Sequence, residues 1–237
     1  MKILRLMCFF SLAYVIIFPI DSAYAKKGTQ VLVPDTVKDP HSRYTAIYES
    51  VHLSHCSAIL ISSTVALTAK HCGGNYLSSF NGTIYPGESG MSTPFGYMNV
   101  RVYIPHPRYD IALLKGTEQD QSRAYKYYFK GFKRTAVTAL SDKALKDMIG
   151  RDVYAYGYPY QFSRYKQYRS DGRIQNYYQQ DFFLYTSMPT YEGQSGSGAF
   201  LKNGRFIGII TTRNQHYEGN ILPITQDIAD WINKNAN

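Results

Sequence analysis

Short runs of apolar, aromatic and β-branched residues fill most of the chain, and few stretches have the spacing of a helix. Glycine, proline and asparagine turn formers separate these runs. The pattern predicts an all-β protein of many short strands. The runs expected to form strands are residues 44–51, 57–67, 97–103 and 110–114 in the first half, and 151–158, 172–178, 181–187, 198–201, 205–212 and 220–223 in the second.

The C-terminal stretch has a different pattern. Ile228, Trp231 and Ile232 recur at the spacing of one helix face, and Thr225 is a residue type that caps helices. We expect a short helix over residues 225–235 that packs by this face, because a frayed tail would leave Trp231 in water.

Residues 115–150 are interpreted as the connection between two halves. Within them, residues 123–134 carry five lysines and arginines, interleaved with aromatic residues and without an acid. Such a run is compatible with binding single-stranded nucleic acid. A solvated strand or linker face with a few buried rings is the commoner outcome, and we expect no nucleic-acid partner.

The N-terminus has the organisation of a secretory signal peptide. Lys2 and Arg5 precede an apolar run of about 15 residues, shorter than the roughly 20 that cross a bilayer, and Ala23-Tyr24-Ala25 has the small residues of a cleavage site. We expect cleavage after Ala25, a secreted or periplasmic protein, and no membrane attachment once the signal is removed. Residues 26–30 are a candidate pro-segment.

The composition is that of a globular protein, with 237 residues of which 44% are hydrophobic and 18% charged. The net charge of +9 favours acidic partners without identifying one. We expect a monomer. The predicted division is residues 1–25 as signal peptide, 26–135 and 136–224 as two β-barrels, and 225–237 as the C-terminal helix.

Three cysteines are present, and Cys8 lies in the predicted signal peptide. Cys56 and Cys72 remain as one even pair in an exported chain, which predicts a disulfide. Two free buried thiols are the alternative. No metal site is expected, because no second pair of ligands has the spacing of a zinc site.

Three segments supply the parts for attack on an amide carbonyl. His71 lies in residues 67–72 (LTAKHC), Asp110 begins residues 110–114 (DIALL), and Ser195 lies in residues 193–198 (GQSGSG). A serine hydroxyl needs a neighbouring imidazole to take its proton, and the imidazole needs a carboxylate on its other nitrogen. Glycine at 193 and 196 permits the tight backbone from which the N–H groups of Gly193 and Ser195 would bind an oxyanion.

These segments resemble those of the trypsin/chymotrypsin-like serine peptidases. The resemblance rests on residues 56–60 (CSAIL) before LTAKHC, on 103–107 (YIPHP) before DIALL, and on 193–197. In the second half, residues 153–159 (VYAYGYP) are closest to the bacterial glutamyl-endopeptidase branch. The similarity covers residues 31–233.

The resemblance implies an all-β fold of two packed six-stranded antiparallel β-barrels with an active site between them. It implies that His71 is the general base and acid, that Asp110 orients it, and that Ser195 is the nucleophile. No cofactor is implied, and the partner is a protein or peptide substrate. The residues implied to contact substrate are Pro189, Thr190, Ile210, Thr211, Thr212 and Arg213.

Several positions depart from the family pattern. Gln194 stands where trypsin-like zymogens have an aspartate, so that activation switch is not expected. Pro189 stands where trypsin has an acidic pocket base. Thr190 matches a glutamate-reading threonine, but Ile210 replaces the histidine of that branch. We hypothesise that Arg213 supplies a positive charge to the pocket instead.

Two other functions were weighed. An α/β-hydrolase is disfavoured, because its nucleophile elbow has glycine two residues before and after the serine, and because its histidine follows the serine. A catalytically inactive homologue that binds protein or an anionic surface is the alternative from another class.

Overall fold

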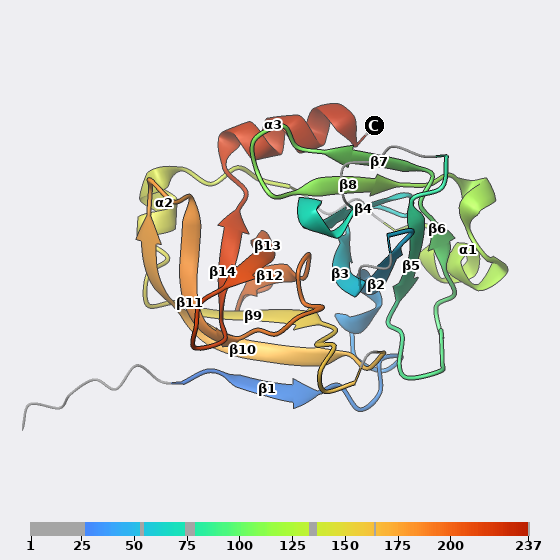
Figure 1. The fold of residues 1–237 in the computed structure, drawn as a ribbon, viewed down its shortest axis with the longest axis horizontal. Coiled ribbons are helices and arrows are strands. Elements are labelled where there is room, and N and C mark those ends of the chain that lie inside the picture. Colours follow the sequence, from blue (N-terminus) through green and yellow to red (C-terminus); the bar gives the residue numbers. More distant parts are fainter. Residues whose placement is uncertain (1–26, 53–54, 74–78, 133–136, 164, 237) are drawn as a thin grey trace, which may run out of the picture.

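The computed structural model describes residues 27–52, 55–73, 79–132, 137–163 and 165–236. Two antiparallel sheets dominate it and lie side by side in Figure 1. The predicted signal peptide, and Lys133 and Arg134 of the basic segment, lie outside the described residues.

The first sheet has the strand order β6-β5-β2-β3-β4-β8-β7. Its edges β6 and β7 are separated only by Val100 and Arg101. The chain pairs with β5 before this bend and with β8 after it, and the Arg101 N–H donates to Lys115 O at 2.9 Å. The sheet is therefore a curled half-barrel. Its strands are β2 (Thr45–Ser50), β3 (His55–Leu60), β4 (Val65–Thr68), β5 (Gly82–Pro86), β6 (Met98–Asn99), β7 (Val102–Pro105) and β8 (Ala112–Lys115).

The second sheet is a closed six-stranded barrel with one added strand. Strands β9-β10-β11-β14-β13-β12 form a ring, because β9 pairs with both β10 and β12. The N-terminal strand β1 pairs with β10, so it joins this second sheet although it precedes the first in the chain. The strands are β1 (Thr29–Leu32), β9 (Asp152–Gly157), β10 (Tyr168–Tyr178), β11 (Phe183–Pro189), β12 (Gly198–Leu201), β13 (Phe206–Arg213) and β14 (Glu218–Pro223).

The connection between the sheets is more helical than its sequence pattern indicates. Ser122 caps α1 by accepting the Tyr125 N–H at 3.2 Å, and Tyr125 and Phe129 bury one face of it. The basic residues described in this segment are exposed, as expected of a solvated face. The helical elements are α1 (Arg123–Phe129), α2 (Asp142–Lys146), α3 (Gln226–Asn235), and the short 3₁₀ turns η1 (Ser42–Tyr44), η2 (Lys70–Cys72) and η3 (Glu118–Asp120).

The predicted C-terminal helix is confirmed as α3. Ile228 and Ile232 are fully buried in a cluster with residues of both sheets, among them Leu67 of β4 and Ile209 of β13. Helix α3 thus covers the seam where the two sheets meet (Figure 1). Within the described parts of the chain, no helix is long and apolar enough to cross a membrane.

The predicted all-β, two-barrel class is confirmed, and so is the predicted disulfide. Cys56 on β3 is bonded to Cys72 at the end of η2, with their Cα atoms 6.1 Å apart. The bridge closes a short loop, since 16 positions separate the two cysteines.

Replacing both cysteines, Cys56→Ser with Cys72→Ser, is expected to lower the free energy of unfolding by about 3 kcal/mol, because the unfolded chain regains the freedom of that loop. Urea unfolding of the oxidised wild type and the double variant measures the difference. Wild type unfolded under reducing conditions should match the double variant, and equal stability of all three samples would contradict the prediction.

Candidate functional site

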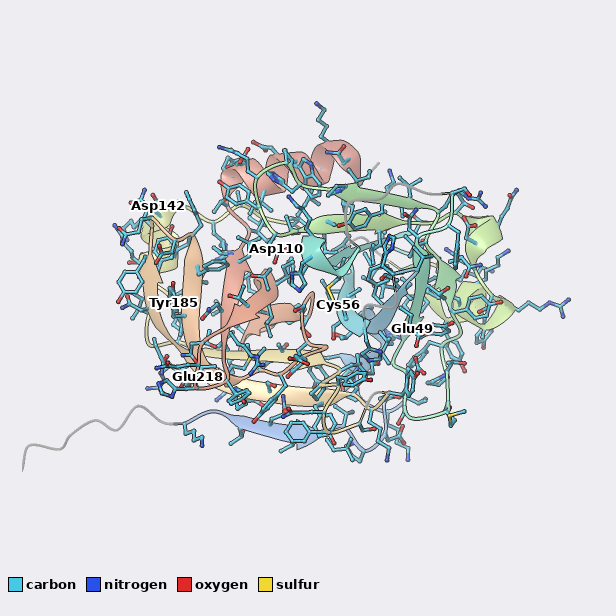
Figure 2. The ribbon with its side chains drawn as sticks, viewed as in Figure 1. Glu49, Cys56, Asp110, Asp142, Tyr185 and Glu218 are labelled. Atoms are coloured by element: carbon cyan, nitrogen blue, oxygen red, sulfur yellow. A yellow bond between two sulfur atoms is a disulfide. The ribbon has the colours of Figure 1, made fainter. Side chains whose placement is uncertain are left out.

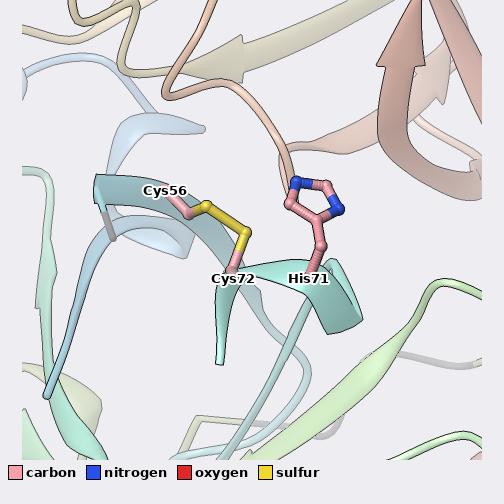
Figure 3. Close-up of side chains that lie close together, drawn as sticks. All are labelled: Cys56, His71 and Cys72. Atoms are coloured by element: carbon pink, nitrogen blue, oxygen red, sulfur yellow. A yellow bond between two sulfur atoms is a disulfide. The ribbon is translucent and has the colours of Figure 1, made fainter. Parts of the chain in front are cut away.

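Two consecutive residues of β3 connect to the segments that carry His71 and Ser195. Cys56 is joined to Cys72, the residue after His71, and in Figure 3 the His71 ring lies beside this disulfide. The next residue, Ser57, donates its backbone N–H to Ser195 O at 2.8 Å. Strand β3 of the first sheet is therefore linked both to the segment of His71 and to the segment of Ser195.

The Ser57 side chain adds two more hydrogen bonds to the serine loop. Its hydroxyl donates to Gly193 O at 2.8 Å and accepts the Tyr158 N–H at 3.1 Å. Ser57 is fully buried. Its three hydrogen bonds tie the loop around Ser195, and the end of β9, to the first sheet.

His71 and Asp110 form a direct pair. The His71 Nδ1 lies 2.8 Å from Asp110 Oδ2, and the His71 backbone N–H donates to Asp110 Oδ1 at 3.0 Å. Asp110 directly precedes Ile111 and β8, and Figure 2 shows it between the two sheets. Both carboxylate oxygens are thus used to hold one histidine.

Asp110 is charged in this arrangement. Burial would raise the pKa of its carboxyl, but the hydrogen bonds and charge of His71 outweigh burial and hold the pKa below its ordinary value. A charged carboxylate accepts only, so Nδ1 carries the proton of this hydrogen bond, and Nε2 can accept a proton whenever the ring is neutral. The His71 side chain is half exposed, so Nε2 is accessible.

The loop before and after Ser195 depends on glycine. Gly193 has φ +92°, and a Cβ there would lie 2.2 Å from Tyr158 O. Gly196 has φ +88°, and its Cβ would lie 2.1 Å from Ser57 O. A side chain at 193 would clash with the chain that follows β9, and one at 196 would clash with β3 of the first sheet.

Two backbone N–H groups of this loop lack an acceptor. Gln194 N–H donates to Tyr191 O at 3.1 Å, and Gly196 N–H donates to Ile210 O at 2.7 Å. The N–H groups of Gly193 and Ser195, by contrast, make no hydrogen bond with any described residue. Two such donors beside a serine can hold a negatively charged oxygen. Among the same residues, no hydrogen bond joins the Ser195 hydroxyl to His71.

The buried Gln194 side chain fixes the loop by neutral hydrogen bonds. Its Oε1 accepts the Tyr191 N–H at 2.9 Å and the Gln30 amide at 3.0 Å. Ser170 Oγ on β10 accepts from both amides, at 2.7 Å from Gln30 and 3.3 Å from Gln194. The N-terminal strand β1 is therefore linked directly to the residue between Gly193 and Ser195.

Three of the residues expected to contact substrate have contrasting surroundings. Pro189 ends β11 and lines a cavity of about 510 Å³ together with Tyr191 and Tyr217. Thr190 is 3% exposed, and its hydroxyl donates to Met188 O at 3.3 Å. Ile210 is 1% exposed and packs in the core of the barrel.

The other three lie at the end of β13. Strand β12 pairs with β13 only as far as Ile209, so residues 211–213 have β14 on one side and no registered strand on the other. This leaves an edge to which an extended peptide can pair. Thr212 is exposed. The Arg213 guanidinium lies 4.4 Å from the centre of the Tyr217 ring and 3.7 Å from Glu192.

Cys56, His71 and Cys72 bring their ligand atoms within 4.8 Å of one another, the spacing of a metal site. The two sulfur atoms are bonded to each other. Neither is then a thiolate, so this group offers a metal ion only the histidine.

Sequence reasoning missed Ser57 and Gln30. Ser57 begins an expected strand run and Gln30 ends the candidate pro-segment, and their partners, Ser195 and Gln194, lie far away in the chain. One indirect signal for Gln30 was present in the sequence. Gln194 stands where trypsin-like zymogens have a charged aspartate, so its side chain needs a partner other than an ammonium group.

Comparison with known proteins agrees with this geometry. The family model for the trypsin-like peptidase domain matches residues 56–209. The chain therefore belongs to the trypsin-like peptidase family. No curated protein sequence matches it.

Solved structures of similar fold include three proteases. A Glu endopeptidase in complex with MPD has a TM-score of 0.69 and 18% identity, with 86% of this chain and 95% of that chain covered. The protease Anisep from Arthrobacter nicotinovorans has a TM-score of 0.63, 16% identity and coverages of 83% and 96%. The thermostable serine protease AL20 from an extremophilic microorganism has a TM-score of 0.61 and 14% identity, with 82% of this chain and 98% of that chain covered. They establish the chymotrypsin-like fold.

Gln30→Glu is expected to lower kcat for peptide hydrolysis by about tenfold, because it keeps the shape of Gln30 but removes the amide donors that hold Gln194 and, through it, the loop of Gly193 and Ser195. The measurements are kcat and KM on one peptide, with the unfolding temperature of each variant.

Thr29→Ala is the matched control on the same strand, since Thr29 is exposed. A loss confined to KM, or an unchanged kcat in Gln30→Glu, would contradict the positioning role of Gln30.

Proposed function

We propose that this protein is a secreted serine endopeptidase that hydrolyses peptide bonds with His71, Asp110 and Ser195. The trypsin-like peptidase family supports peptidase function. The observation that carries the proposal is the pairing of the His71 Nδ1 with Asp110 at 2.8 Å, on a segment that the disulfide joins to β3, whose Ser57 N–H donates to Ser195 O.

The proposed reaction proceeds through an acyl-enzyme. Ser195 Oγ attacks the carbonyl carbon as His71 Nε2 takes its proton, and the N–H groups of Gly193 and Ser195 bind the oxyanion. His71 then gives the proton to the leaving amine as the C–N bond breaks. Water, deprotonated by His71, attacks the acyl-enzyme, and Ser195 leaves with the proton.

The acyl side of the substrate would pair with the open edge of residues 211–213 and direct its P1 side chain toward Thr190 and the cavity beside Pro189. Arg213 supports an acidic P1 residue by charge, although Glu192 at 3.7 Å offsets part of this charge. Ile210 replaces the histidine of the glutamyl-endopeptidase branch and is buried in the core, so Arg213 is the candidate cation for an acidic P1 side chain.

Export of the protein is part of the proposal. A disulfide and the homologous proteases are consistent with an extracellular location, and the signal peptide over residues 1–25 remains a prediction from sequence. The domain division at residues 135 and 224, and a monomeric state without a nucleic-acid partner, are likewise proposed from sequence.

A fluorophosphonate probe is expected to label the wild-type protein and to leave Ser195→Ala unlabelled, because the probe reacts only with an activated serine. Asp110→Asn should lower kcat by about 10⁴, since the ring would lose its orienting carboxylate. In-gel fluorescence and peptide kinetics measure the two effects.

Circular dichroism of each variant controls for folding. A correctly folded wild type that does not label would instead support the alternative function, an inactive homologue that binds protein or an anionic surface.

A peptide library varied at P1 is expected to show preference for Asp or Glu, and Arg213→Gln should reduce that preference relative to neutral P1 residues. Arg205→Gln is a control of equal charge change, because Arg205 is exposed in the turn between β12 and β13. Absence of any acidic preference in the wild type would sink the assignment of Arg213.

A further inference from the structure

A second cavity, of about 680 Å³, reaches Gly193 from the side of the first sheet. Its lining includes Glu49 of β2 and His55 of β3, as well as Glu192 and Gly193. It shares no lining residue with the cavity of Pro189, Tyr191 and Tyr217. In Figure 2, Glu49 of one cavity and Glu218 of the other lie on opposite sides of Asp110 and Cys56.

The two cavities correspond to the two sides of the scissile bond. In the proposed binding mode, the acyl part of the substrate lies along the β13 edge and Pro189. The residues after the scissile bond therefore lie on the other side of Gly193. His55 directly precedes Cys56, whose disulfide adjoins His71, the residue that protonates the leaving amine. The second cavity therefore lies where the residues after the scissile bond emerge.

The charge of this cavity is opposite to that of the whole molecule. The chain carries a net charge of +9, yet the described residues that line the cavity include two carboxylates and no lysine or arginine. Among the described residues, no salt bridge neutralises Glu49. Burial, followed by the charge of Glu49, raises the pKa of the nearby Glu88 to about 8.

Strand register directs Glu49 into the cavity. Glu49 pairs with His55 across β2–β3 and with Thr83 across β2–β5, and all three line the cavity. Cross-strand partners project from the same face of a sheet. The half-buried Glu49 is therefore the middle of a row of three side chains that faces this cavity.

The walls suit the stem of a long cationic side chain. Tyr160 and Tyr165 line the cavity and meet the His55 ring edge-on, with ring centres 5.5 and 5.7 Å away. Aromatic walls accommodate the methylene groups of lysine or arginine and attract their charge.

We propose that this cavity is a leaving-group subsite in which Glu49 selects a Lys or Arg side chain among the first three residues after the scissile bond. The proposal rests on the proposed peptidase function. Glu192 contributes less, because its side chain is 81% exposed and already lies 3.7 Å from Arg213.

The test uses internally quenched peptides with a mixture of residues at P1 and with Lys, norleucine or Glu at P1′, P2′ or P3′ in turn. At pH 7, kcat/KM for Lys should exceed that for Glu by roughly tenfold at one of these positions, the effect of one charged hydrogen bond. Within each variant, the Lys-to-Glu ratio cancels changes in general activity. Glu49→Gln should reduce the ratio below about twofold, and Glu49→Lys should reverse it.

Glu118→Gln is the matched control, because Glu118 is an exposed acid on η3 that does not line the cavity. It should keep the wild-type ratio, and a rise in NaCl should lower that ratio in both proteins.

The outcomes separate the two proposals. Two outcomes contradict the subsite alone, in a protein that labels at Ser195 and cleaves peptides. One is the absence of a charge preference at P1′ to P3′, and the other is a preference that is unchanged in Glu49→Gln. A folded preparation that neither labels nor cleaves contradicts the peptidase function and the subsite with it.

Discussion

The site depends on one strand that holds both halves of the chemistry. On β3, Cys56 is covalently joined to the segment of His71, and Ser57 hydrogen-bonds to Ser195 and Gly193 through its backbone N–H and its hydroxyl. The proposed base on the first sheet and the proposed nucleophile on the second must remain in register, although each sheet packs around its own core. The shared apolar seam, covered by α3, keeps the sheets together, and the two residues of β3 set the finer alignment.

The hydrogen bonds of the Gln194 side chain hold this loop without a charge. Trypsin-like zymogens have an aspartate at this position, which is held by an ion pair after activation. Gln194 is fully buried, so a charge there would need a buried partner at a cost in desolvation. Amide-to-amide bonds avoid that cost and remain unchanged with pH. The partner Gln30 lies on β1, so the N-terminal strand is part of the structural support of the site.

Much of the fold and the chemistry followed from local patterns. Alternating short runs indicated the strands, the spacing of Ile228 and Ile232 indicated α3, and three short segments singled out His71, Asp110 and Ser195 as candidates. The helix α1 was missed because only two buried rings mark its inner face. Ser57, Gln30 and Glu49 were missed because their roles arise from register and from contacts between distant segments, which composition and periodicity do not encode. Ile210 was expected to contact substrate, and in the structure it is buried among core residues of the second sheet.

The acyl-enzyme is the species in which base, nucleophile and oxyanion donors must all act together. Mass spectrometry of the protein after rapid mixing with a slowly hydrolysed ester, followed by peptide mapping, detects it directly. We predict a mass increase equal to the acyl group on the peptide that contains Ser195, and no increase in a folded His71→Ala variant. Acylation at another residue, or none in a folded wild-type protein, would contradict the assignment of Ser195 as the nucleophile activated by His71.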